Sequence, residues 1–290
     1  MHIELEKCAD RWVGCANRFS GEEMTESNNA PSFSDLPEGY VTDILSITSP
    51  RDACRAASIS KAFHSAADSD AVWDRFLPLD YRQVIARTVS PVVFESKKQL
   101  YHRLSESYII LDRGYLGLKL DRESGRKCYM LGVRNLSIVV WGGDTRYWEW
   151  GHSPESRFAE VGILRCVWWL DIQGRIASAM LSPKATYVAY LVFRVTRDSW
   201  GLSALGKTIV TFGGVRNETS NVYLQQPRTQ AHTQTPRSNG WMEIKLGEFY
   251  YDNGDEGEIE MGFRSIMNIK EALWKVLRFG LSSVLIIDCE

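Results

Sequence analysis

Two different periods of apolar residues divide the chain into a helical part and a strand-rich part. From residue 36 to residue 78 apolar side chains recur at helical spacing, as at Val41, Ile44 and Leu45. After about residue 115 they occur instead in short runs separated by turn residues, which is typical of β-strands. The pattern therefore predicts a small helical module followed by a β-domain.

The helical module is predicted to contain three short helices. The first covers about residues 36–47. The second begins at Ser49-Pro50, because Ser49 can accept hydrogen bonds from free amides and proline needs no N–H at the first helical position. The third has Ser69 as its candidate cap and Trp73 on its buried face. A core this small is marginal by itself and gains stability from a partner or a neighbouring domain.

The β-domain is predicted to be an antiparallel sandwich. Residues 187–193 are apolar at nearly every position, which indicates a central strand covered on both faces, whereas residues 241–246 alternate cleanly. Seven or more strands without intervening helices favour a jelly-roll-like sandwich over a parallel sheet, and the expected fold class is α+β. The clearest predicted strands are 136–141, 159–172, 187–195, 207–212, 221–224, 241–249 and 258–263.

These patterns predict five segments along the chain. Residues 1–31 end in a polar stretch rich in Ser, Asn and Glu, which indicates a disordered extension. The connector after the helical module is expected to hold a helix that Ser96 caps. The expected boundaries are 1–31 for the extension, 32–78 for the helical module, 79–114 for the connector, 115–275 for the β-domain and 276–290 for an atypical C-terminal tail.

Composition and charge exclude several classes of function. The 290 residues are 44% hydrophobic and 24% charged, and the net charge of −2 is not that of a nucleic-acid-binding protein. No apolar run is long enough to span a membrane and no secretion signal is visible, so we expect a protein of the cytoplasm or nucleus, or both. The six cysteines are scattered and predict reduced thiols, with no metal site and no cofactor.

The helical module resembles an F-box. The matching residues are Leu36-Pro37, Ile44-Leu45-Ser46, Ser49 to Ala53, Ala57 to Phe63, and Trp73. The resemblance implies docking to a cullin-ligase adaptor of the S-phase-kinase-associated type. By resemblance the docking residues are Leu36, Pro37, Ile44, Leu45, Ser60, Lys61 and Trp73. The alternative is that Ile44, Leu45 and Trp73 only form the core of the module.

The β-domain resembles the plant phloem protein 2-like lectins, also called Nictaba-type domains. The matching stretches are 125–131, 134–138, 141–150, 169–176, 187–193 and 239–249. An F-box followed by this domain is the arrangement of the B group of that family. The resemblance implies binding of carbohydrate, an N-glycan or another glycan that contains N-acetylglucosamine, at Trp141 and Trp148.

Two other interpretations of these tryptophans remain open. Both can be core residues, as we expect for Trp168, Trp169 and Trp241 in their apolar strands. The chain also has one residue more than is usual in the family before Trp141, which reverses the facing of its side chain unless a bulge absorbs it. A β-domain that has lost sugar binding and binds a polypeptide is therefore the alternative function.

Catalysis is not expected. Four carboxylates are conceivable as a glycosidase pair, but the sequence contains no nucleophile elbow, phosphate-binding loop or dinucleotide fingerprint. The acidic stretch 252–258 does not match a calcium loop and is interpreted as a solvated hairpin tip. The four carboxylates are Glu149, Glu155, Glu160 and Asp171.

Overall fold

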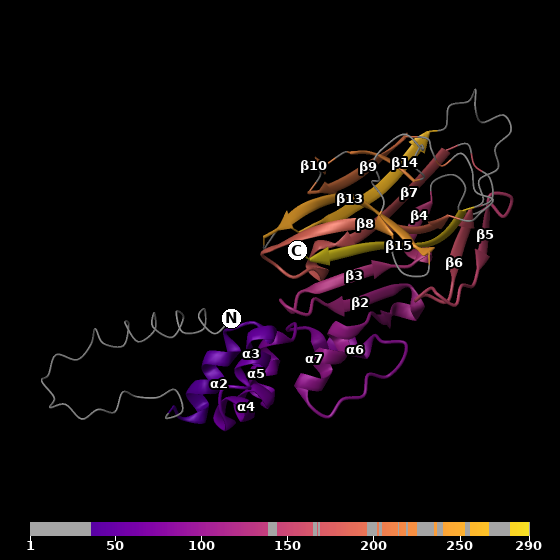
Figure 1. Cartoon of the computed structure of the whole chain (residues 1–290). Helices are drawn as coiled ribbons and strands as arrows, with labels where there is room; N and C mark the ends of the chain where they lie inside the picture. Colours follow the sequence, from indigo (N-terminus) through magenta and orange to yellow (C-terminus); the bar gives the residue numbers. More distant parts are fainter. Residues whose placement is uncertain are drawn as a thin grey trace, which may run out of the picture. The chain divides into compact units, whose positions relative to one another are not determined.

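The computed structural model describes most of the chain from residue 36 onward, so the predicted extension 1–31 lies outside the described residues. It contains a set of short helices followed by two β-sheets (Figure 1). The described residues are 36–138, 144–164, 167, 169–195, 202, 205–213, 215–218, 220–224, 235–236, 240–252, 256–266 and 279–289.

The helical module contains four described helices where the sequence predicts three. They are α2 (Glu38–Ser46), α3 (Pro50–Ala56), α4 (Lys61–Asp68) and α5 (Asp70–Phe76). The predicted start of α3 is confirmed, because the Ser49 side chain accepts a hydrogen bond from the Asp52 amide at 3.1 Å. The helix that the sequence analysis missed begins at a second serine cap, Ser60, which accepts from the Phe63 amide at 3.3 Å.

The connector carries α6 (Tyr81–Ala86) and α7 (Lys97–Glu106). Ser96 caps α7 as predicted and accepts a hydrogen bond from the Gln99 amide at 3.2 Å. The buried face of α7, which includes Leu100 and Tyr101, contacts α5 on one side and strand β2 on the other. This helix therefore belongs to the cores of both the helical module and the β-domain.

The described strands form two antiparallel sheets, which are stacked face to face (Figure 1). Sheet A has the order β1-β2-β3-β15-β8-β13-β12, with β6 on β15 and β5 on β6, and sheet B has the order β10-β9-β14-β7-β4, with β11 on β9. The strands of sheet A are β1 (Ile109–Leu111), β2 (Leu116–Leu120), β3 (Lys127–Leu131), β5 (Trp148–Gly151), β6 (Val161–Leu164), β8 (Ala185–Val195), β12 (Thr235–Pro236), β13 (Met242–Tyr251) and β15 (Phe279–Cys289). The strands of sheet B are β4 (Leu136–Ile138), β7 (Trp169–Ala177), β9 (Leu205–Phe212), β10 (Val215–Glu218), β11 (Asn221–Tyr223) and β14 (Glu258–Ile266).

Strand β8 is the predicted central strand. It lies between β15 and β13, and alternate residues such as Leu191 and Phe193 are fully buried between the two sheets. On the other face of the strand Val188 and Val192 are also buried, and Val192 packs in a hydrophobic cluster there. The other buried members of that cluster are Met130, Phe158 and Trp241. Two covered faces explain why this strand is apolar at nearly every position.

Two predicted boundaries differ from the structure. The expected C-terminal tail contains β15, a strand of 11 residues that pairs with β3 and β8 in the middle of sheet A, so the β-domain extends beyond residue 275. The predicted strand 159–172 is two strands in different sheets, β6 and β7. An apolar run reveals strand propensity but not its pairing, which is set by residues far away in sequence.

Candidate binding sites

The predicted adaptor-binding residues separate into a surface group and a core group. Pro37 and Lys61 are exposed, and Ile44 is 37% exposed. Leu36 and Ser60 are half-buried. Leu45 is only 2% exposed and Trp73 is fully buried. Both values agree with the alternative that these two residues form the core of the helical module.

Helix α2 presents an exposed apolar stripe that the sequence analysis did not separate from the core. Tyr40, Ile44 and Ile47 are 64%, 37% and 77% exposed and recur at spacings of four and three residues, which places them on one side of the helix. Val41 and Leu45 form the buried stripe beside them. The sequence already contains two apolar stripes within residues 40–47, and a helix that packs on one side buries only one of them.

Trp73 links the helical module to the connector. Its indole N–H donates to the Ala67 carbonyl at 2.6 Å, and its ring lies 5.2 Å from that of Tyr101 on α7. The Lys98 ammonium lies 5.6 Å from the centre of the same indole. Trp73 therefore influences any docking surface through the packing of the module and not by direct contact.

A shallow hollow of about 580 Å³, lined by polar residues, lies between α2 and α4. Ser65 donates to Glu38 across it at 2.6 Å. The Lys98 ammonium donates a hydrogen bond of 2.5 Å to Asp68 and holds the pKa of that carboxyl below its ordinary value. The lining residues are Glu38, Lys61, His64, Ser65, Asp68 and Ser69.

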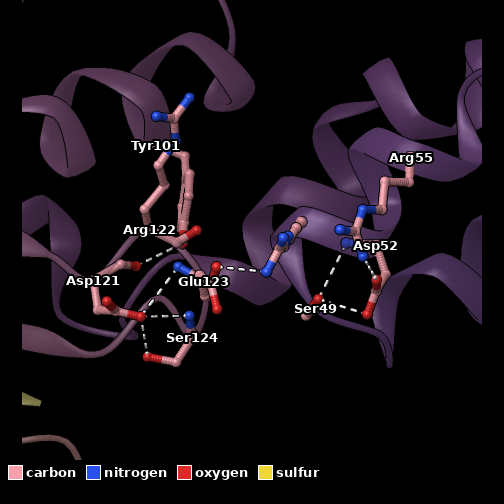
Figure 2. Close-up of polar contacts among 9 residues, drawn as sticks. Ser49, Asp52, Arg55, Tyr101, Asp121, Arg122, Glu123 and Ser124 are labelled. Carbon is pink, nitrogen blue, oxygen red and sulfur yellow. Dashed lines mark hydrogen bonds and ion pairs between the residues drawn. The ribbon is translucent and has the colours of Figure 1, made fainter. Parts of the chain in front are cut away.

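The turn between β2 and β3 joins the β-domain to the helices (Figure 2). Arg51 on α3 forms an ion pair of 2.7 Å with Glu123, and the Tyr101 hydroxyl donates to the Asp121 carbonyl at 3.0 Å. Gly125 has φ +71°, and a Cβ there would lie 2.8 Å from the Phe76 carbonyl oxygen, so only glycine fits. The helical module is thus packed directly on this turn.

A second ion pair at this junction is buried on one side. The Lys127 ammonium lies 3.0 Å from Asp80, and the side chains are 7% and 40% exposed. Asp80→Asn is expected to lower the free energy of unfolding by about 2 kcal/mol, because it leaves a buried ammonium without its counter-charge. Urea unfolding of the full-length chain measures this loss.

Glu123→Gln is the matched control for that substitution. Its partner pair with Arg51 has side chains that are 52% and 67% exposed, so water replaces the lost interaction, and a change below about 0.5 kcal/mol is expected. Equal losses in the two variants would contradict the importance assigned to burial at Lys127.

Trp148, one of the two predicted sugar-binding residues, lies in the core. Its side chain is 1% exposed, and a Cβ at Gly162 would lie 3.2 Å from its Cζ3 atom, so the indole packs against the backbone of the neighbouring strand. The structure therefore leaves Trp148 without an exposed face for a sugar, in contrast to the expectation from the sequence. Trp141, the second predicted residue, lies outside the described residues.

Trp150 is half-buried and is covered by an arginine. The Arg134 guanidinium carbon lies 3.9 Å from the centre of an indole ring of Trp150. Two hydrogen bonds of 2.8 and 2.9 Å join the same guanidinium to Glu160 and hold the pKa of that carboxyl below its ordinary value. Arg134 therefore links Glu160 to Trp150 of the β5–β6 hairpin, and its guanidinium covers one face of the indole.

Two of the four candidate carboxylates have pKa values shifted in the direction opposite to that of a glycosidase acid. Such an acid needs a raised pKa. The pKa of Glu160 is lowered by Arg134, and that of Glu155 is lowered by a hydrogen bond from Ser153. Asp171 lies in an ion pair with Arg264, and Glu149 is exposed.

Neither a metal cluster nor a membrane helix is found in the described part of the chain. No three His, Cys, Asp or Glu side chains there are grouped to hold a metal ion. None of the described helices combines the length and apolarity that crossing a membrane requires. Part of the acidic stretch 252–258 lies outside the described residues.

Comparison with known proteins identifies the family. The Phloem protein 2 family model matches residues 126–278, more than half of the chain, and the F-box-like model matches residues 33–78. The chain belongs to the phloem protein 2-like F-box proteins. F-box proteins are generally substrate adaptors of ubiquitin ligase complexes and not catalysts.

Curated relatives of this phloem protein 2-like F-box chain support the assignment over most of its length. F-box protein At2g02240 from Arabidopsis thaliana is 39% identical and the match covers 88% of this chain and 80% of the relative. F-box protein PP2-B10 from the same plant is 38% identical, with 83% and 90% covered.

Solved structures resemble this chain only distantly. A carbohydrate-binding module in complex with β-1,4-galactotriose is 10% identical, with a TM-score of 0.30, and the match covers 53% of this chain and 87% of that one. A xylan-binding domain is 11% identical, with a TM-score of 0.29 and coverages of 53% and 86%. At these TM-scores the likeness says nothing about what this chain binds.

Proposed function

We propose that this chain is the substrate receptor of a cullin-type ubiquitin ligase and acts in the cytoplasm or nucleus. The F-box binds an adaptor of the S-phase-kinase-associated type, and the β-domain binds carbohydrate on the target protein. The observation that carries the first half is the exposed apolar stripe Tyr40, Ile44 and Ile47 on α2 of an F-box.

The stripe has the chemistry of a docking surface. Large apolar side chains that recur on one side of an exposed helix gain free energy when a partner removes them from water. Pro37 and Lys61, two of the residues predicted to contact the adaptor, are exposed on the same four-helix module. The buried Leu45 and Trp73 then hold the stripe in position.

One preparation of the full-length chain tests both halves of the proposal. We expect the chain to co-purify with the adaptor and to bind N-acetylglucosamine-containing glycans on an array. The discriminating measurement is capture of target proteins before and after enzymatic removal of N-glycans. Loss of capture after deglycosylation supports the lectin function, whereas unchanged capture together with an empty array would contradict it and leave the ligase role standing.

The alternative, a β-domain that binds a polypeptide, is favoured by one specific observation. Trp148, which the family resemblance implies as a sugar contact, is 1% exposed. If targets are captured equally well without their glycans, and free oligosaccharide does not compete, this alternative is the function of the β-domain.

A further inference from the structure

The outer face of sheet B carries polar and aromatic side chains on its central strands. Along β7, Leu170 and Ile172 are buried between the sheets, so alternation places Trp169, Asp171 and Gln173 on the opposite, outer face. Trp169 is half-buried there, although the sequence predicts it in the core. The neighbouring strand β14 brings Arg264 opposite Asp171 in register.

Asp171 is a buried carboxylate beneath a half-exposed arginine. The side chains of Asp171 and Arg264 are 6% and 50% exposed. Arg264 donates to one carboxylate oxygen from Nε at 2.8 Å and lies 2.6 Å from it through Nη2, while Gln173 donates to the other oxygen at 3.1 Å. These contacts use Nε and Nη2, so in the described part of the chain the two N–H groups of Nη1 remain for a ligand.

The Asp171–Arg264 ion pair is an inefficient way to stabilise the fold. An exposed ion pair contributes little to stability, whereas removing a carboxylate from water is costly. The pair Arg175–Glu260 on the same two strands shows the ordinary solvated form, with a distance of 2.7 Å and side chains that are 56% and 44% exposed. The burial of Asp171 fixes the orientation of the Arg264 guanidinium.

Gly262 lies two residues before Arg264 on the same face of β14. In the cross-strand register Gly262 lies between Gln173 on β7 and Ile209 on β9. A Cβ at Gly262 would lie 2.7 Å from the Ile172 carbonyl oxygen and 3.2 Å from Cγ of Gln173, so a side chain is excluded. Gly262 therefore places no side chain between Gln173 and Arg264, and Trp169 lies two residues before Asp171 on β7.

We infer that this face is the carbohydrate-contacting surface of the β-domain. A pyranose needs an apolar surface for its C–H groups and fixed donors and acceptors for its hydroxyls. Trp169 provides the first, and Arg264 with Gln173 provides the second. Asp171 is a positioning residue that orients Arg264. This inference rests on the proposed carbohydrate function and assigns it to residues other than Trp148.

The test measures calorimetric binding of the full-length chain to N,N′,N″-triacetylchitotriose and to a high-mannose N-glycan. For whichever probe binds, Arg264→Gln and Trp169→Leu are each expected to weaken affinity about tenfold or more, the loss of a charged hydrogen bond or of a stacking surface. Arg175→Gln is the matched control, because it removes the same charge from the same face, and it is expected to change affinity less than about twofold. Thermal unfolding of each variant separates lost binding from lost folding.

The role of Asp171 is tested through Arg264. Asp171→Asn is expected to weaken binding in the unaltered chain and to have a clearly smaller effect in the Arg264→Gln background, because most of its influence on the ligand passes through that guanidinium and the rest through Gln173. Additive effects of the two changes contradict the positioning role. Sugar binding that is unaffected by Arg264→Gln and Trp169→Leu overturns this inference and leaves the proposed function intact, and no binding of either probe by the unaltered chain overturns both.

Discussion

Replacing Ile44 and Ile47 together by glutamate is expected to weaken adaptor binding by at least about 100-fold, since it places two charges in an apolar interface. The two side chains are 37% and 77% exposed on α2, so the free chain hydrates the new carboxylates and its thermal midpoint stays close to that of the unaltered protein. Titration calorimetry with the purified adaptor, supported by circular dichroism of the variant, measures both quantities.

Tyr250→Glu is the control for this double substitution. Tyr250 is 57% exposed on β13, far along the chain from the F-box, and the same apolar-to-charged change there is expected to leave adaptor affinity unchanged. If the α2 variant binds the adaptor as tightly as the unaltered chain, the docking surface assigned to Tyr40, Ile44 and Ile47 is wrong.

Trp73→Ala is expected to give the largest loss of stability, about 3–5 kcal/mol for a buried tryptophan. The indole is fully buried, donates to the Ala67 carbonyl, and contacts the rings of Phe76 and Tyr101. Four short helices have little stability to lose, so we expect them to become exchange-labile while the two sheets remain protected. Hydrogen exchange followed by mass spectrometry distinguishes the helical segment 38–76 from β7 and β14.

Trp150→Ala is the matched control among the tryptophans. Its indole is half-buried beneath Arg134, and its removal is expected to cost about 1 kcal/mol and to leave exchange in the helices unchanged. Helices that stay fully protected in the Trp73→Ala variant would contradict the central role of that residue in the F-box core.

Local chemistry was readable from the sequence. The caps at Ser49 and Ser96 depend on hydrogen bonds to amides three residues ahead, and both were predicted because nothing distant is needed to form them. The change from helical to strand period near residue 115 separated the two modules for the same reason. Strand β8 was recognised as central because both of its faces are apolar.

The facing of particular side chains was not readable from the sequence. Alternation assigns Trp169 and Asp171 to one side of β7 and Leu170 to the other, but it does not say which side the opposite sheet covers. Trp148 was expected at the surface, and its burial follows from pairing with Leu164 on β6 and from the absence of a side chain at Gly162. Such outcomes depend on contacts between strands and not on the local pattern.

The sequence by itself determined the family, the order of an F-box before a β-domain, and the capped starts of α3 and α7, whereas the start of α4 was missed and the predicted cap Ser69 makes no cap hydrogen bond to α5. Only the tertiary structure decided that β15 completes the centre of sheet A, that α2 leaves one of its two apolar stripes exposed, and that Arg264 meets Asp171 across 93 residues of chain. The physical reason is that capping and periodicity act over a few residues, whereas burial and ion pairing require partners that long-range strand register brings together.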